Sequence, residues 1–169
     1  MAFDLQPADL RGALVALRPL RPDDFDALFA AASDRLIWEQ HPASDRYTQP
    51  VFRKYFDGAI ASGGAFLVSD SKTGEIIGCS RYHDLNEAES RVEIGFTFLI
   101  RSRWGGAYNG ELKRLMLDHA FRFVETVVFT AGPTNFRSRR ALEKIGAVLQ
   151  GPGVNSNGDA CVVFHLHRP

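Results

Sequence analysis

A short glycine-rich segment is the first part of the chain whose composition suggests chemistry. The segment RSRWGGAYNG, residues 101–110, contains Gly105, Gly106 and Gly110, and a helix-forming run, ELKRLMLDHAF, follows it. The first N–H groups of a helix have no intrahelical partner, and the helix dipole adds partial positive charge there. Because glycine lets a large anion approach the backbone closely, this segment could bind phosphate groups. An ordinary turn between a strand and a helix is the alternative.

The spacing of these glycines excludes two common nucleotide-binding motifs. The segment does not match the GxxxxGK[ST] pattern of a P-loop, and it does not match the GxGxxG pattern of a dinucleotide-binding fold. Any phosphate bound here therefore belongs to another class of ligand.

A second polar segment, AGPTNFRSRRALEKIGA, combines the end of an apolar run with a basic amphipathic helix. Asn135 is suited to cap this helix, and Gly146 is suited to end it. Ser138 carries a hydroxyl one turn into the helix and could serve as a cap or as a hydrogen-bond donor. Three arginines could contact phosphate groups or form a solvated basic face: Arg137, Arg139 and Arg140.

An acidic residue, Glu93, lies within the alternating run SRVEIGFTFLI. Period-two alternation places one set of apolar residues on a single face: Val92, Ile94, Phe96, Phe98 and Ile100. Glu93 lies on the opposite face, where burial could raise its pKa toward neutrality. The alternative is an exposed glutamate that pairs with Arg91 or Arg81.

Hydrophobic periodicity along the chain predicts the strands and helices that position these residues. Strands are expected at residues 12–20, 65–70, 75–85, 90–100, 126–132, 147–151 and 160–167. Helices are expected at residues 21–33, 48–64, 111–124 and 135–147, with an irregular segment at 34–44. The order β-α-α-β-β-β-α-β-α-β-β predicts a mixed α/β fold around a central sheet, in a single domain over residues 1–169.

Bulk composition limits the functional classes. Lys and Arg total 20 and so do Asp and Glu, which gives no argument for binding a nucleic acid. Cys79 and Cys161 are the two cysteines, no signal pattern opens the chain, and no apolar run approaches transmembrane length, so we expect a cytoplasmic protein without a membrane partner. The five histidines lack the spacing of metal ligands, so no metal is expected.

The order and separation of RSRWGGAYNGELKRLML and AGPTNFRSRRALEKIGA resemble those of acetyl-coenzyme A dependent N-acetyltransferases of the GNAT superfamily. The resemblance covers nearly the whole chain and is closest to the branch that acetylates N-terminal amines of ribosomal proteins. It implies a mostly antiparallel, twisted sheet of about seven strands, splayed at its central strands, with helices on both faces.

The resemblance also implies that acetyl-CoA is the co-substrate. Backbone N–H groups of the glycine-rich segment would hold its pyrophosphate: Gly105, Gly106, Ala107, Tyr108, Asn109 and Gly110. The family signature is Q/R-x-x-G-x-G/A; Trp104 stands at its Gln/Arg position, Ala107 at its glycine and Asn109 at its small last residue. Phe98, Leu99 and Ile100 would follow the pantetheine arm. Asn135, with Arg139 or Arg140, would supply further contacts.

For catalysis, the resemblance points to Glu93 as the general base, acting directly or through water, at the splay formed by residues 94–97. Many family members place a tyrosine acid where this chain has Leu142, so Ser138 is the expected donor to the leaving thiolate.

The same resemblance assigns the acceptor pocket to Trp38, His41, Tyr82 and His83, with Asn155 as a further candidate. The acceptor would be a primary amine, either a protein N-terminus or a small molecule. A catalytically inactive acyl-CoA binding module is the alternative function. The late strand CVVFHLH could also pair across a sheet edge and form a homodimer.

Overall fold

The structure is a computed structural model, and it describes residues 2–169. Eight strands form one sheet: β1 (Leu10–Arg11), β2 (Val15–Pro19), β3 (Ala65–Asp70), β4 (Ile76–Asn86), β5 (Arg91–Leu99), β6 (Thr126–Ala131), β7 (Val148–Val154) and β8 (Ala160–His167). Five α-helices and two short 3-10 helices accompany them: η1 (Pro22–Asp24), α1 (Phe25–Ala32), α2 (Arg35–Trp38), α3 (Gln49–Ser62), η2 (Arg101–Arg103), α4 (Tyr108–Ala120) and α5 (Phe136–Lys144).

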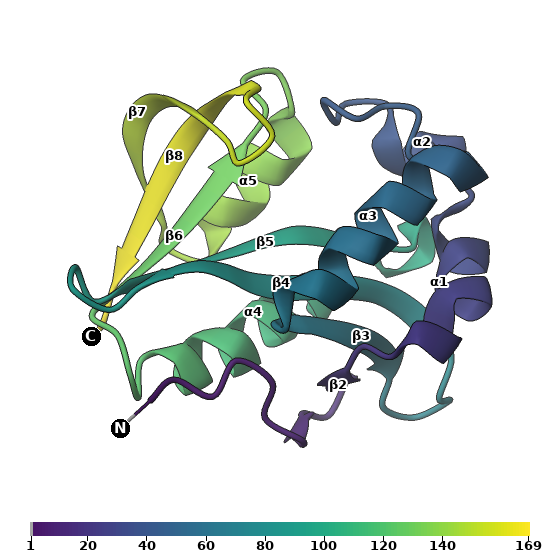
Figure 1. Cartoon of the computed structure of the whole chain (residues 1–169), viewed down its shortest axis with the longest axis horizontal. Helices are drawn as coiled ribbons and strands as arrows, with labels where there is room; N and C mark the ends of the chain where they lie inside the picture. The colour runs from purple at the N-terminus through teal and green to yellow at the C-terminus, as the bar shows by residue number, and fades with distance from the viewer. Residues whose placement is uncertain (1) are drawn as a thin grey trace.

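The helices form a layer on each side of the sheet, as Figure 1 shows for α3 and α4. One apolar cluster joins α1, α2 and α3 to β3, Cys79 and Phe98. The other joins α4 and Leu142 of α5 to the opposite side of the strands, with Ile94 and Leu99 of β5. Each layer buries its apolar stripe, which is the usual basis of a two-sided α/β fold.

The sheet order is β1-β2-β3-β4-β5-β6-β8-β7, and all neighbours are antiparallel except β5 and β6. β5 pairs with β6 at only three residues, the last being Glu93 opposite Val128. Beyond them the two strands separate, and β6, β8 and β7 fan away from β5 (Figure 1). The expected fold class and its central splay are therefore confirmed.

An irregularity in β5 corrects the predicted alternation of apolar residues. The register of β4 and β5 shifts between Cys79 and Arg81, and Phe96 has a positive φ of 53°. This bulge reverses the faces of the strand beyond it. Phe98 consequently packs on the α1–α3 side, and Leu99 packs on the α4 side with Ile94. The prediction that residues 92–100 keep one apolar face is wrong.

Other differences are small. The strand β1 and the short helix α2 were not expected, since two and four residues give no periodic signal. The predicted ends of α3 and α5 are confirmed, because Gly63 and Gly146 follow the helices with φ values of 63° and 92°.

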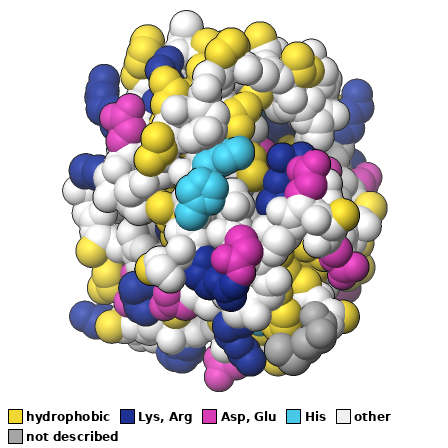
Figure 2. Space-filling view, turned by 90° about the vertical axis from the view of Figure 1, so that its left-hand side faces the viewer, with side chains coloured by type: hydrophobic (Ala, Val, Ile, Leu, Met, Phe, Trp, Pro, Cys, Tyr) yellow, Lys and Arg dark blue, Asp and Glu magenta, His cyan; other side chains and the backbone are white. Residues whose placement is uncertain are grey.

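The last part of the sheet bears on the expected dimer. β8 cannot offer an edge, because it pairs with β6 on one side and β7 on the other. The edge strand is β7, where Val148, Leu149 and Val154 are exposed. Figure 2 shows the side of the molecule that lies at the left of Figure 1. On this side, apolar side chains are interspersed with charges of both signs. A homodimer stays a prediction, with β7 as the strand available for it.

In residues 2–169 no helix combines the length and the apolar character that crossing a bilayer requires.

Candidate active site

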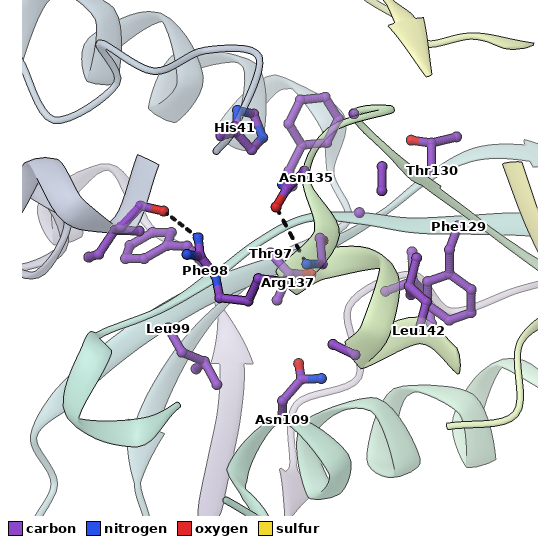
Figure 3. A pocket seen from close by; sticks show the side chains of 18 of the residues that line it. His41, Thr97, Phe98, Leu99, Asn109, Phe129, Thr130, Asn135, Arg137 and Leu142 are labelled. Carbon is purple, nitrogen blue, oxygen red and sulfur yellow. Dashed lines mark hydrogen bonds between the residues drawn. The ribbon is translucent and has the colours of Figure 1, made fainter. Parts of the chain in front are cut away.

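A cavity of about 270 Å³ opens where β5 and β6 separate. Its walls come from β5 and β6, from the loop before α4, from α5, from the segment between α2 and α3, and from the loop between β7 and β8. Figure 3 shows side chains from these elements pointing toward a common space. About half of the site residues singled out in the sequence therefore line one cavity at the splay.

The glycine-rich segment forms one mouth of this cavity. None of the backbone N–H groups of Gly105–Gly110 donates a hydrogen bond to another part of residues 2–169. A Cβ added at Gly105, Gly106 or Gly110 would meet nothing within 4 Å, so the backbone faces open space. Gly105 has a φ of 72°, which favours glycine. Ala107 is the N-cap of α4 and provides no side-chain cap. The donors at this helix end are thus free for an anion.

An indole fixes this loop to the end of β5. The Nε1 atom of Trp104 donates to the carbonyl of Leu99 over 2.8 Å, and the guanidinium carbon of Arg137 lies 3.8 Å from the centre of the Trp104 ring. Arg137 also donates to the carbonyl of Ile37 over 2.8 Å, as drawn in Figure 3. Trp104 therefore links the loop to β5 and to α5, and Arg137 continues this contact to α2.

The predicted coenzyme residues divide into two groups. Phe98, Leu99, Trp104, Gly105, Asn109 and Asn135 line the cavity. Ile100, Gly106, Ala107, Tyr108, Gly110, Arg139 and Arg140 do not line it. Arg139 is bonded to the carbonyl of Pro133 and Arg140 is exposed, whereas Arg137 is the arginine of α5 that lines the cavity. Their phosphate contacts stay predictions, because phosphates can lie outside the cavity.

Glu93 lies at the last paired residue before the splay and is only 9% exposed. Its Oε2 atom lies 3.2 Å from Nε2 of His83, and Nδ1 of His83 lies 2.9 Å from Oδ2 of Asp84. Burial raises the pKa of Glu93 to about 7, against a hydrogen bond from Thr130 that lowers it. Burial also lowers the pKa of His83, against the opposing effect of Asp84. A carboxyl whose pKa is raised to about 7 is therefore in contact with an imidazole whose pKa is lowered by burial.

His83 lines the cavity and Glu93 does not. The carboxylate therefore meets the cavity through the imidazole, and Asp84 continues the chain of side chains toward solvent, with its side chain 63% exposed. This arrangement can pass a proton from the cavity to the surface. The alternative pairing of Glu93 with Arg81 or Arg91 is wrong: Arg81 stacks on the Phe96 ring, and Arg91 pairs with Glu89.

The same three residues also place potential metal ligands within 4.8 Å of one another. Sequence spacing does not indicate this group, because His83 and Glu93 meet only through the pairing of β4 with β5. His83 is hydrogen-bonded to Asp84 and contacts Glu93, and the absence of a metal stays a prediction.

Helix α5 presents its first turn to the cavity. The Oδ1 atom of Asn135 accepts a hydrogen bond from the N–H of Ser138 over 3.4 Å, which confirms Asn135 as the N-cap. The hydroxyl of Ser138 makes no hydrogen bond within the described part of the chain and lines the cavity one turn before Leu142. Ser138 is therefore not the cap, and its hydroxyl is available to a ligand.

A buried lysine that the sequence analysis did not single out reaches the cavity from α4. Lys113 is 5% exposed, and its Nζ atom donates to the hydroxyl of Thr97 over 2.7 Å. That hydroxyl lies 2.8 Å from Ser80 Oγ. Burial lowers the pKa of Lys113 to about 7. A usable signal was present, because Lys113 lies three residues before Met116 and four before Leu117 on the buried stripe of the helix.

The predicted acceptor residues are partly confirmed in position. Trp38, His41, His83 and Asn155 line the cavity. His41 stays neutral, because burial beside Arg46 and Arg137 lowers its pKa to about 3, and its Nδ1 atom accepts from the N–H of Ala43. The prediction that Tyr82 lines the acceptor pocket is wrong. Tyr82 is completely buried on the α4 side and donates its hydroxyl to the carbonyl of Met116.

Comparisons with known proteins agree with this fold. The fold matches a GCN5-related N-acetyltransferase from Brucella melitensis with a TM-score of 0.78 and 23% identity, covering 96% of this chain and 81% of that one. An acetyltransferase from Agrobacterium tumefaciens str. C58 matches with a TM-score of 0.73 and 25% identity, over 96% and 95% of the two chains. A Vibrio cholerae protein provisionally described as a ribosomal-protein-serine acetyltransferase matches with a TM-score of 0.73 and 15% identity, over 95% and 97%.

No curated protein matches the sequence. The family described as acetyltransferase (GNAT) domain matches residues 15–148, which include the β5–β6 splay, the glycine-rich loop and α5. The chain therefore belongs to the GNAT acetyltransferase family, and it is an acyltransferase enzyme.

Proposed function

We propose that this enzyme transfers the acetyl group of acetyl-CoA directly to a primary amine. The observation that carries the proposal is the Glu93–His83 contact, with the pKa of Glu93 raised to about 7, at a cavity that also meets a helix end whose N–H groups are free. Amide formation from a thioester needs a proton acceptor for the amine and donors for the developing charges. The cavity brings side chains of both kinds together.

The coenzyme would enter at the glycine-rich loop. The free N–H groups of residues 105–110 and the positive end of α4 are suited to a pyrophosphate. Phe98 and Leu99 of the unpaired part of β5 would flank the pantetheine arm. Arg137, fixed between Trp104 and the Ile37 carbonyl, would add positive charge at the same mouth.

In the reaction, the acceptor ammonium loses a proton to the His83–Glu93 pair, and Asp84 returns it to solvent. The neutral amine attacks the thioester carbonyl, the C–S bond breaks, and the proton that the nitrogen loses as the amide forms passes to the leaving thiolate. The Ser138 hydroxyl would donate a hydrogen bond to that sulfur, in place of the tyrosine absent at Leu142. Direct transfer needs no cysteine, and burial raises the pKa of the Cys79 thiol to about 11, which keeps that thiol unreactive.

Calorimetric titration with acetyl-CoA, repeated with 3′-dephospho-CoA, tests the binding step. Micromolar affinity that depends on the 3′-phosphate would support the loop and the basic helix as the coenzyme site. Turnover with a panel of primary amines then tests the transfer step. Absence of acetyl-CoA binding would contradict the proposal, whereas binding without turnover on any amine would favour the inactive acyl-CoA module.

A further inference from the structure

Arg46 is a buried cation without an anion at the acceptor side of the cavity. It is 6% exposed and lines the cavity, and its Nε atom has no hydrogen-bond partner in residues 2–169. Its guanidinium carbon lies 5.2 Å from the centre of the Trp38 ring and 4.7 Å from that of Tyr55. Aromatic faces satisfy part of the charge, but they supply no hydrogen-bond acceptor that fits the guanidinium fork.

The charged groups around Arg46 are almost all cationic. Arg81 of β4 is also 6% exposed and makes no ion pair in the described chain, and Arg137 faces the region from α5. His41 is held neutral by this charge and by burial, which lower its pKa. The one acidic neighbour is Asp45, which is exposed and forms no ion pair with Arg46. Burying a cation without a partner costs free energy. The surroundings of Arg46 therefore favour the binding of an anion.

Arg46 is connected to the splayed strand β5 through Tyr55. The Tyr55 hydroxyl donates to the carbonyl of Phe96, the bulge residue of β5, so one tyrosine connects the Arg46 guanidinium with the splay. On the other side of the bulge, the His83 ring lies 5.0 Å from the Phe96 ring. A molecule held at Arg46 by one end would have its other end near His83.

We propose that the acceptor amine carries a carboxylate, and that Arg46 binds this carboxylate on the wall formed by the α2–α3 segment. The inference rests on the proposed amine acetylation and specifies its substrate class. Arg46 is the cation that the α2–α3 segment contributes to the cavity lining, and its planar guanidinium fork fits the two oxygens of a carboxylate. The source would be a free amino acid or an acidic side chain near a peptide N-terminus.

Matched acceptors distinguish these sources. The kcat/KM values of amino acids and of their amides test a free α-carboxylate, and peptides that begin with Asp or Glu, against Asn or Gln, test an acidic side chain. In one of the two pairs the carboxylate form should be preferred by about 100-fold or more, because a site built around a buried polar group rejects the analogue that leaves the group unpaired. Equal kcat/KM values within both pairs would overturn the inference while leaving amine acetylation intact.

The variant Arg46→Gln should abolish that preference, lowering kcat/KM for the carboxylate substrate about 100-fold and changing that for the neutral partner only a few-fold. Arg53→Gln is the matched control, since Arg53 lies on α3, is half-exposed, stacks on Phe25 and does not line the cavity. A loss of acetyl-CoA affinity in Arg46→Gln, with the acceptor preference retained, would instead assign Arg46 to the coenzyme and overturn the inference.

A second readout does not depend on turnover. The enzyme loaded with CoA is mixed with a hydroxycarboxylate analogue of the preferred acceptor, which has no amine, and thermal unfolding is followed. The analogue should raise the midpoint of the wild type and leave that of Arg46→Gln unchanged. Without ligand, Arg46→Gln should unfold no earlier than the wild type, because the buried charge is removed. An equal shift in both proteins would contradict the assignment, even if no acceptor amine had yet been found.

Discussion

Replacing Glu93 with glutamine should lower activity and raise stability at the same time. The carboxyl is buried, and its pKa is raised from 4.5 to about 7. The folded state therefore favours the protonated form, and the stability that this form contributes is lost as the pH rises from 4.5 through 7. Glutamine resembles the protonated carboxyl, keeps a contact with His83 and cannot ionise.

The size of the stability change follows from the pKa shift of Glu93. Two to three pKa units correspond to about 3 kcal/mol. The free energy of unfolding of Glu93→Gln should equal that of the wild type below pH 4.5 and exceed it by about 3 kcal/mol above pH 7. Turnover should fall by roughly 10²- to 10⁴-fold, the usual contribution of general base catalysis. The wild-type pH profile of kcat/KM should lose activity below an apparent pKa of about 7, and the variant should lack that limb.

Urea unfolding across this pH range measures the first effect, and initial rates of CoA release measure the second. Glu89→Gln is the control, because Glu89 is an exposed partner of Arg91 at the turn before β5 and should change neither quantity appreciably. Reduced stability in Glu93→Gln above pH 7 would refute the burial argument. Unchanged turnover would remove Glu93 from the mechanism.

Three further substitutions test other parts of the site. Lys113→Met should raise the free energy of unfolding by on the order of 5 kcal/mol below pH 7, since the pKa of the buried lysine falls from 10.5 to about 7, and the gain should vanish above pH 10.5; urea titrations that show no gain below pH 7 would contradict this. Ser138→Ala should lower kcat about tenfold with acetyl-CoA affinity unchanged, because one hydrogen bond to the leaving sulfur is lost; stopped-flow single turnovers at saturating coenzyme measure it, and an unaltered rate would exclude the donor role. Gly105→Ala should weaken acetyl-CoA binding and destabilise the loop by about 1 kcal/mol, because its φ is 72°, whereas Gly106→Ala should do less at a position without positive φ; equal effects in calorimetry would argue against the strain.

The order of elements could be read from the sequence because most of them have a clear period. Residues 65–68 and 127–129 are short apolar runs typical of buried strands, and Asn135 and Gly146 mark the ends of α5 by their own backbone chemistry. The bulge at Phe96 was not predictable in this way. A phenylalanine at a positive φ gives no local signal, and the Tyr55 hydroxyl that bonds its carbonyl comes from a helix far away in the chain.

The candidate site shows the same division. Glu93, Ser138 and the glycine-rich loop could be proposed because each belongs to a segment with a recognisable pattern. The partner of Glu93 could not, since the contact with His83 depends on the register of β4 and β5. Arg46 lies in an irregular segment, where neither period nor spacing indicates burial. Tyr82 was misplaced because the resemblance assigned it to the acceptor pocket by its strand, which does not say which face of that doubly covered strand meets the cavity.

The central claim is acetyl transfer from acetyl-CoA to an amine, and product analysis tests it most directly. The purified enzyme is incubated with acetyl-CoA labelled in its acetyl group and with matched carboxylated and neutral amines. Free CoA thiol and labelled amide are then quantified in the same samples. The account predicts equal amounts of thiol and amide, with a strong decrease of both in Glu93→Gln. Release of thiol without amide, or binding of acetyl-CoA without release of either product, would contradict it.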